Sequence, residues 1–331
     1  MPRSVGGVLR AVVGIAISVG ALAFVLRSVD LARTAEVIRN AAPGWLALMA
    51  AFLVADVLFR AFRWQRLIEP IHPVRYSRML AYLLVGYLAN NVLPARLGEL
   101  VRSHYLGDRE GISRTATLGT VVVERVVDTA VVVLIAALAI FVLSVRGVVA
   151  SAVLVGLAVA GVLVVGLGVA LAAHRLPGAD RVVARVDRWP RVRELGSKLR
   201  DGLAVAGRPK TIGSALLLSI AAWSMSVLAF AAAGQSVGIQ LSIGQAALLA
   251  AGVALATAVP SGPGYLGTFE LAAVKIAEAF GIESDSAFAL ALLAHAGILL
   301  VTSAGGVIAL ARLGWVPLSS SRSPAEVDLA D

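Results

Sequence analysis

Long apolar segments separated by short polar ones make up most of the chain. Six of them are close to or above the roughly 20 residues that an α-helix needs to cross a bilayer. None shows the residue-by-residue alternation expected of a strand in a membrane β-barrel. The pattern therefore predicts an all-α polytopic membrane protein, with transmembrane helices at about 7–26, 44–62, 117–143, 148–173, 212–233 and 286–311.

Two further apolar segments, 79–105 and 244–280, are interrupted by proline and glycine. A helix from Met79 to Asn91 would rise only about 20 Å, which is too short for roughly 30 Å of hydrocarbon. We therefore expect each segment to be a re-entrant hairpin that turns near the middle of the membrane. The residues expected to shape the two tips are Pro94, Gly98, Pro260, Gly262, Pro263, Gly264 and Gly267.

The distribution of basic residues predicts the topology. The polar connection 174–210 carries ten Lys and Arg residues, and the positive-inside rule places such a loop in the cytoplasm. Arg60 and Arg63 mark 60–78 as cytoplasmic in the same way, and Arg102 marks 102–114. The loops around 244–280 contain no Lys or Arg. We therefore expect hairpins that enter from opposite sides, and both termini in the cytoplasm of a prokaryote.

A short sequence pattern occurs in both hairpins. Pro-x-x-Leu-Gly is found at 94–98 and again at 263–267, and Glu99 and Glu270 follow. Opposite orientation together with this echo indicates inverted repeats, an arrangement in which interrupted helices form a substrate site near the midplane. We expect one transmembrane domain at 1–311, with repeat halves at about 44–173 and 212–311, the basic loop 174–210 and a short disordered tail at 312–331.

The overall composition agrees with a membrane protein and excludes several kinds of site. The chain is 59% hydrophobic with a mean hydropathy of +0.88, whereas soluble domains are about half apolar. Its net charge of +9 is explained by basic cytoplasmic loops, so we expect no nucleic-acid partner. With no cysteine, and with four histidines that lack metal-ligand spacing, the chain is expected to bind no metal and no cofactor.

The first hairpin, "NNVLPARLGELVR", places polar groups at membrane depth. Arg96 and Glu99 are three residues apart, on one face of a helix. A single charge at this depth costs about 2.5–3.5 kcal/mol. The two residues either pair to pin the hairpin, or belong to an anion site in which Arg96 binds a phosphate. Asn90 and Asn91 would add neutral donors.

A second polar group, "ERVVD", lies near the start of an apolar span. Glu124 and Asp128 are four residues apart on one helical face, and Arg125 lies beside them. These charges either extend to the membrane surface or complete a polar cavity with Arg96.

The second tip, "PSGPGYLGTFE", forbids a continuous helix and lets the backbone approach a ligand closely. Ser261, Tyr265 and Thr268 offer hydroxyl groups to a substrate. Glu270 begins the returning helix, where a carboxylate is favoured by the helix dipole. Its role is either that of a first-turn acid or that of a functional carboxylate.

Three isolated features have simple structural explanations. Asp56 lies four residues before Arg60 and is expected to pair with it. Lys275 and Glu278 are expected to form a surface pair. His295, alone in an apolar helix, is expected to make a hydrogen bond between helices.

The motifs "NNVLPARLGELVR", "ERVVD" and "PSGPGYLGTFE", in this order, resemble those of the lysylphosphatidylglycerol synthase transmembrane-region, or flippase-like, family over nearly the whole chain. The resemblance implies lipid translocation. It does not extend to lysyl-lipid synthesis, because we expect no aminoacyltransferase domain after the membrane part. The motif positions that match the family are Asn91, Pro94, Arg96, Gly98, Glu99, Glu124, Arg125, Pro263, Gly264, Gly267 and Glu270.

The expected function is therefore a lipid flippase that accepts an anionic phospho- or glycolipid headgroup in a midplane cavity, driven by an ion or lipid gradient. Arg96 and Arg125 would hold the phosphate. The groups expected to couple protons are Glu99, Glu124, Asp128 and Glu270. The partners are membrane lipids, and a homo-oligomer is possible.

Two other functions remain open. One is an intramembrane enzyme that acts on a lipid phosphate or a polyprenyl-linked sugar, with Glu99 or Glu270 as general base. No catalytic motif supports it, so we expect no enzyme. The other is a scaffold whose intramembrane charges bind a partner helix.

Overall fold

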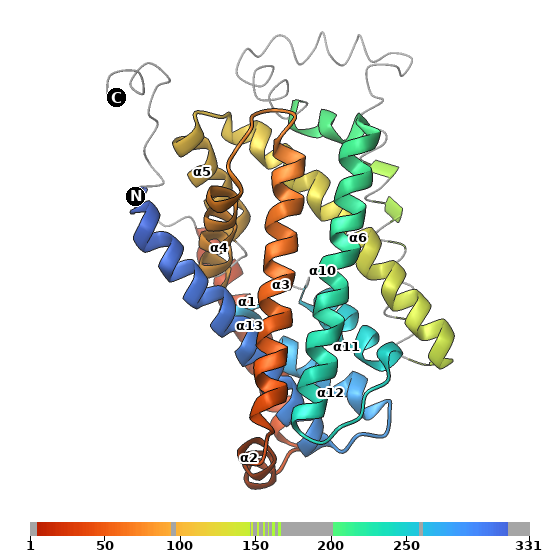
Figure 1. Ribbon diagram of the computed structural model, residues 1–331. Coiled ribbons are helices and arrows are strands. Elements are labelled where there is room, and N and C mark those ends of the chain that lie inside the picture. Colours follow the sequence, from red (N-terminus) through yellow and green to blue (C-terminus); the bar gives the residue numbers. More distant parts are fainter. Residues whose placement is uncertain are drawn as a thin grey trace.

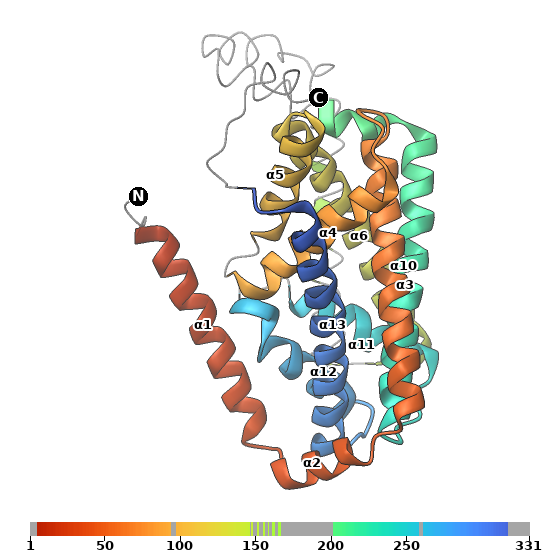
Figure 2. The ribbon, with the colours of Figure 1, turned by 60° about the vertical axis from the view of Figure 1, so that its left-hand side comes forward.

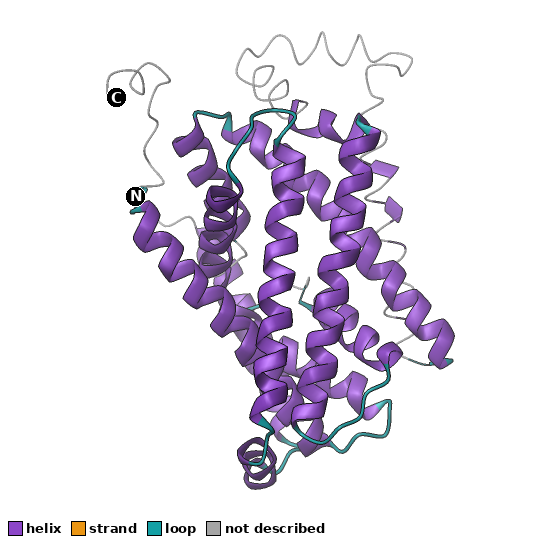
Figure 3. Ribbon diagram, in the orientation of Figure 1, coloured by secondary structure: helices purple, strands orange, loops and turns teal. Residues whose placement is uncertain are grey.

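The computed structural model describes residues 5–93, 97–145, 201–257 and 261–316, together with scattered positions between 147 and 166. In these residues every regular element is a helix (Figure 3). Most of the expected span 148–173, of the expected tail 312–331 and of the basic loop lies outside the described residues, and the last described helix continues into the start of the tail, to Leu313. Pro94, Arg96 and Pro260 also lie outside the described residues.

Within the described residues, four helices are long and apolar enough to cross a membrane. They are α3 (Pro43–Ile68), α6 (Arg114–Leu143), α10 (Pro209–Ser236) and α13 (Ser284–Leu313). They confirm four of the six expected spans. Each extends beyond its apolar stretch, because the flanking polar residues continue the same helix.

The first expected span is also helical. α1 (Val5–Leu26) is followed by α2 (Leu31–Arg39), a helix where the sequence indicated only a loop. Asp30 caps α2 by accepting hydrogen bonds from the backbone N–H groups of Ala32 and Arg33. The stretch Val12–Leu26 of α1 meets α2 at a bend of 87°. Counted as one bent span, the two are long and apolar enough for a fifth crossing among the described residues.

The two interrupted segments form pairs of short helices. α4 (Tyr76–Val92) packs against α5 (Gly98–Glu110), and α11 (Ile243–Ala256) packs against α12 (Thr268–Glu278). A short 3₁₀ helix, η4 (Pro263–Tyr265), lies before α12, and another, η3 (Ala204–Gly207), before α10. The helices therefore break where proline and glycine predict.

The long helices surround these pairs. α3 and α10 lie side by side in the centre of Figure 1, while α13 packs against α4. Figure 2 shows α1 at the edge of the molecule, and its contact there is with α12. The larger apolar core joins α10, α11, α12 and α13, and a smaller one joins α3, α4 and α5.

Two glycines of the shared tip pattern permit close backbone contacts. A Cβ atom at Gly98 would lie 2.1 Å from the carbonyl oxygen of Gly86 in α4, and one at Gly267 would lie 2.1 Å from the carbonyl oxygen of Ser18 in α1. No larger residue fits at either distance. Gly267 also has a positive φ of 86°, which favours glycine.

Candidate functional site

A cavity of about 260 Å³ lies between the helix pairs and the long helices. Among the described residues, α4 and α5 supply Tyr87, Asn90, Asn91 and Glu99, and the tip before α12 supplies Tyr265. Both hairpins therefore border one cavity. The long helices complete the polar part of its wall with Asp56, Arg60, Arg125, Trp223, Ser226, His295 and Thr302.

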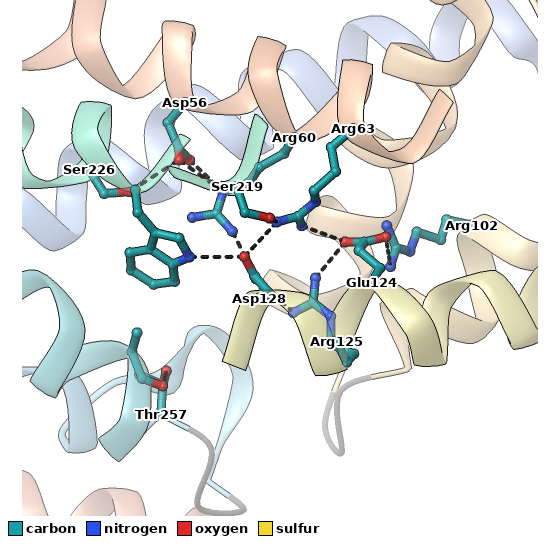
Figure 4. Close-up of polar contacts among 12 residues, drawn as sticks. Asp56, Arg60, Arg63, Arg102, Glu124, Arg125, Asp128, Ser219, Ser226 and Thr257 are labelled. Atoms are coloured by element: carbon teal, nitrogen blue, oxygen red, sulfur yellow. Dashed lines mark hydrogen bonds and ion pairs between the residues drawn. The ribbon is translucent and has the colours of Figure 1, made fainter. Parts of the chain in front are cut away.

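A buried ion-pair network connects α3 and α6 beside this cavity (Figure 4). Arg63 Nη2 lies 2.9 Å from Glu124 Oε1. Arg60 Nη1 lies 3.2 Å from Asp128 Oδ2, and Arg60 Nε lies 2.8 Å from Asp56 Oδ2 on the preceding turn.

Glu124 is the centre of the network, because it contacts three arginines. Besides Arg63, it binds Arg102 of α5, whose Nη2 lies 3.0 Å from Oε2. Arg125 Nη2 lies 2.7 Å from Oε1. Glu124 has no exposed side-chain surface, and it binds the buried guanidinium groups of Arg63 and Arg102 as well as the partly exposed one of Arg125.

α10 supplies neutral partners to the same network. Trp223 Nε1 donates to Asp128 Oδ1 at 2.9 Å, and Ser226 Oγ donates to Asp56 Oδ1 at 3.1 Å. Ser219 Oγ accepts from Arg63 Nη1 at 2.7 Å. These contacts fix the carboxylates and the Arg63 guanidinium in position.

Among the described residues, the groups linked in the network carry an excess of one positive charge, while Glu99 lines the same cavity without being linked to it. The linked members are four arginines, at 60, 63, 102 and 125, and three carboxylates, at 56, 124 and 128. Arg125 is the most exposed of them: 44% of its side chain is accessible, against 12% for Arg60. Because Arg125 also lines the cavity, the excess charge faces a space that a ligand can fill.

The expectation that Arg60, Arg63 and Arg102 lie in loops is wrong. All three lie within helices, and Arg63 and Arg102 are 0% and 3% exposed. The positive-inside rule counts charges by sequence position and cannot detect carboxylates that neutralise them from a distant helix. The pairing of Asp56 with Arg60 is confirmed, but it is one part of the larger network.

Glu124 and Asp128 do not extend to the membrane surface. Their residues are 0% and 6% exposed and belong to the ion-pair network, while Arg125, the third charge of the "ERVVD" motif, borders the cavity. Arg96, which was expected to complete the cavity with them, lies outside the described residues.

The two asparagines of the first hairpin have structural partners. Asn90 Oδ1 accepts from the N–H of Gly98 at 2.7 Å, which closes α4 onto α5. Asn91 Nδ2 donates to Thr302 Oγ1 and Ser303 Oγ, both at 2.9 Å, which fixes the end of α4 to α13. The Glu99 carboxylate, in contrast, has no hydrogen-bond or ion-pair partner among the described residues, although it lines the cavity.

The hydroxyl groups of the second tip are divided between cavity and interior. Tyr265 lines the cavity, with a positive φ of 60° that is uncommon for a bulky residue. Ser261 and Thr268 are not among the lining residues. Thr268 Oγ1 instead donates to the carbonyl of Tyr265 at 3.0 Å, within its own turn.

Glu270 and His295 meet behind this tip. Glu270 Oε1 lies 2.6 Å from His295 Nδ1, and Glu270 Oε2 accepts from the N–H of Gly267 at 2.6 Å. Glu270 therefore does cap the first turn of α12, and His295 does join two helices, as expected. These two features could not be recognised as one unit from the sequence, because nothing in it pairs positions 25 residues apart.

Lys275 and Glu278 form the expected surface pair, with 2.7 Å between Nζ and Oε2. Both side chains are partly exposed, so the pair lies apart from the cavity.

The family model for the lysylphosphatidylglycerol synthase transmembrane region matches residues 11–306. The chain belongs to this family. The match includes every described helix that borders the cavity, and it confirms the resemblance found in the motifs. The protein is accordingly an integral membrane protein.

Two curated relatives are similar to this family member. One is named glycosyltransferase AglD, of Haloferax volcanii, with 25% identity over 96% of this chain and 56% of the relative. The other is a UPF0104 membrane protein of Methanocaldococcus jannaschii, with 30% identity over 32% of this chain and 33% of the relative. The chain therefore spans only about half the length of the first relative.

Proposed function

We propose that this protein is a lipid transporter that carries an anionic headgroup through the cavity while the lipid tails stay in the bilayer. The observation that supports this most strongly is Arg125. Its guanidinium belongs to a buried network with one excess positive charge among the described residues; it lines the cavity and has the most exposed side chain of the network's arginines.

A phosphate suits this charge distribution. A guanidinium group binds phosphate through two parallel hydrogen bonds, and an uncompensated charge inside a membrane protein is costly. A bound phosphate compensates the excess charge and thus gains affinity. Glu99, on the same cavity, would oppose an anion when ionised and admit it when protonated, which makes it a candidate for coupling.

The membrane arrangement that we propose is a pair of re-entrant hairpins in an inverted repeat. Helices α4, α5, α11 and α12 have 17, 13, 14 and 11 residues. At 1.5 Å per residue they rise about 26, 20, 21 and 17 Å, less than the hydrocarbon thickness of about 30 Å. Gly98 and Gly267, at equivalent places in the two tips, both make backbone contacts that exclude a side chain.

The depth of the cavity agrees with this arrangement. Asp56 lies at the middle of α3, with about 20 Å of helix on either side. In this arrangement the polar site lies far from both membrane surfaces, at a depth that a headgroup must pass when it crosses. Both termini lie in the cytoplasm of a prokaryotic cell in this proposal.

The outer surface is suited to the tails. Apolar side chains of α3, α6 and α10 are exposed on it, among them Val54, Leu58, Leu134, Leu138, Leu217 and Ile220. Chains of a lipid can remain among these residues while the headgroup crosses.

A second candidate function is glycosyl transfer to or from a lipid-linked glycan. It is favoured by the printed name of the relative that matches 96% of this chain. The Glu99 carboxylate, which lines the cavity, would then be the general base.

Transport of a fluorescent lipid in proteoliposomes tests the proposal. We expect vesicles with the purified protein to move an anionic lipid from one leaflet to the other faster than empty vesicles. The variant Arg125→Gln should lose most of this rate, and Arg66→Gln, at an exposed pair with Glu69, should keep it. Equal rates with and without protein would contradict the proposal.

Mass spectrometry of the same lipids distinguishes the two candidates. A transporter returns its lipid unchanged, whereas glycosyl transfer changes the mass by a sugar unit when a lipid-linked glycan is supplied.

A further inference from the structure

His295 has two acceptors and needs a hydrogen for each. Its Nε2 lies 2.7 Å from the carbonyl oxygen of Gly264 at the hairpin tip, and its Nδ1 lies 2.6 Å from Glu270 Oε1. The carbonyl oxygen only accepts, so Nε2 must carry a hydrogen. The contact between Nδ1 and Oε1 also requires one hydrogen, on either of the two atoms.

A neutral imidazole and an ionised carboxylate supply only one of these two hydrogens. A second arises in one of two ways: His295 is protonated on both nitrogens, or Glu270 is a carboxylic acid. In both cases the pair holds one proton more than neutral histidine and ionised glutamate would. The observed geometry therefore belongs to a proton-loaded pair.

Loss of this proton changes the contact with the tip. The remaining ring hydrogen would go to the charged Glu270 carboxylate, because hydrogen bonds to ionised acceptors are about twice as strong as those to neutral ones. Nε2 would then turn a lone pair toward the Gly264 carbonyl. The tip would lose its bond to α13.

The tip is a segment that such a loss can release. Gly264 and the following Tyr265 both have positive φ, at 64° and 60°, a conformation that a bulky residue adopts only when its surroundings hold it. On its other side the tip is held by Ser18 of α1, whose Oγ accepts from the N–H of Gly262 at 2.9 Å. His295 and Ser18 thus both anchor this strained turn.

The pair is shielded from other charges. Glu270 and His295 are 1% and 3% exposed, and Phe269 stacks on the imidazole with 4.1 Å between ring centroids. Among the described residues, His295 is the one basic group within 4.0 Å of Glu270.

Other charged and titratable groups lie on the elements around the pair of Glu270 and His295. On α12, Lys275 and Glu278 bind each other. α11 and the residues of α1 from 12 to 26 contain no titratable group. Those that share the cavity with His295 are Asp56, Arg60, Tyr87, Glu99, Arg125 and Tyr265.

We propose that Glu270 and His295 form a binding site for one exchangeable proton, and that this proton holds the second hairpin tip closed against α13. The proposal deepens the transport function by naming the proton as the coupling ion and rests on it for that purpose. Proton binding and tip release are testable without any lipid movement, so the two can fail separately.

The chain has no cysteine, so a single introduced one reports the state of the tip. Ser261→Cys is suitable, because the Ser261 hydroxyl is buried at the tip and has no hydrogen-bond partner to lose among the described residues. The rate of its reaction with N-ethylmaleimide is measured in detergent between about pH 5 and about pH 9. It is divided by the rate for Gln240→Cys, an exposed loop position, which corrects for the reactivity of the thiol itself.

We expect the corrected rate to rise about fivefold to tenfold with pH, the scale set by one buried hydrogen bond. With Glu270→Gln it should stay low at every pH, because the amide N–H replaces the proton and donates to Nδ1. With His295→Phe, whose ring can still stack on Phe269, it should be high at every pH. Glu278→Gln, on the same helix but at the surface pair, should leave the pH dependence of the parent unchanged.

Either of two results would overturn the proposal. One is a corrected rate that does not depend on pH in the parent. The other is an unchanged pH dependence in Glu270→Gln, an isosteric change that keeps the shape of the site.

Discussion

Glu124 of α6 lies 2.9 Å from the Arg63 guanidinium of α3, and neither side chain has any exposed surface. The same carboxylate binds Arg102 and Arg125. The contacts of Glu124 thus join α3, α5 and α6 in the interior of the protein. Removal of its charge is therefore expected to affect both the stability of the protein and the cavity.

The variant Glu124→Gln should therefore be strongly destabilised. Three arginines lose a charged partner, and breaking a buried ion pair on one side costs about 3–5 kcal/mol. Thermal unfolding of the purified protein measures the change. Glu69→Gln, at an exposed pair with Arg66, serves as the control and should change stability by less than about 1 kcal/mol.

The tip glycines should not tolerate alanine. Gly98→Ala and Gly267→Ala each bring a methyl group to 2.1 Å from a backbone carbonyl oxygen, and overpacking of this kind costs about 1–3 kcal/mol or more. We expect a lower melting temperature for both. Gly213→Ala, in α10 with no neighbouring atom within 4 Å, should be neutral or stabilising by up to about 1 kcal/mol. Equal stability of all three would show that the close contacts are absent.

Trp223 should matter through its hydrogen bond as well as its packing. Trp223→Phe keeps a ring beside Arg60 but removes the N–H that donates to Asp128 at 2.9 Å. A hydrogen bond to a charged group contributes about 1.5–3 kcal/mol, and we expect a loss of stability of that size. Trp45→Phe, at a side chain 42% exposed, should have little effect. If both variants lose the same stability, the Asp128 contact is unimportant.

The helices were predictable from sequence because each depends on a run of neighbouring residues. Four spans and both helix breaks follow from apolar length and from the positions of Pro and Gly. The short helix Leu31–Arg39 was not predicted, because its nine residues include three charged ones and do not form an apolar segment.

The ion-pair network was only partly predictable. The motif around Glu124, Arg125 and Asp128 marked one helix of it. Its partners Arg63 and Arg102 belong to other helices, and Arg63 is 61 positions from Glu124. From one sequence these arginines are indistinguishable from the basic residues of a cytoplasmic loop.

The pairing of His295 with Glu270 was missed for the same reason. His295 is an isolated histidine in an apolar helix, and its two partners come from α12 and from a tip whose shape depends on three glycines. Its role becomes visible only when both ring nitrogens are seen to face acceptors.

Transport through the cavity requires that a lipid headgroup enters it beside Arg125. A photoreactive benzoylphenylalanine at Phe230, which lines the cavity, tests this requirement against the same group at Phe141, which is 82% exposed on the outside. After irradiation in vesicles with an anionic phospholipid, mass spectrometry identifies which part of the lipid is attached. We predict attachment to the headgroup at Phe230, lost in Arg125→Gln, and to the tails alone at Phe141, unchanged in Arg125→Gln. Attachment to tails alone at both positions, or headgroup attachment that persists without Arg125, would contradict headgroup entry beside Arg125.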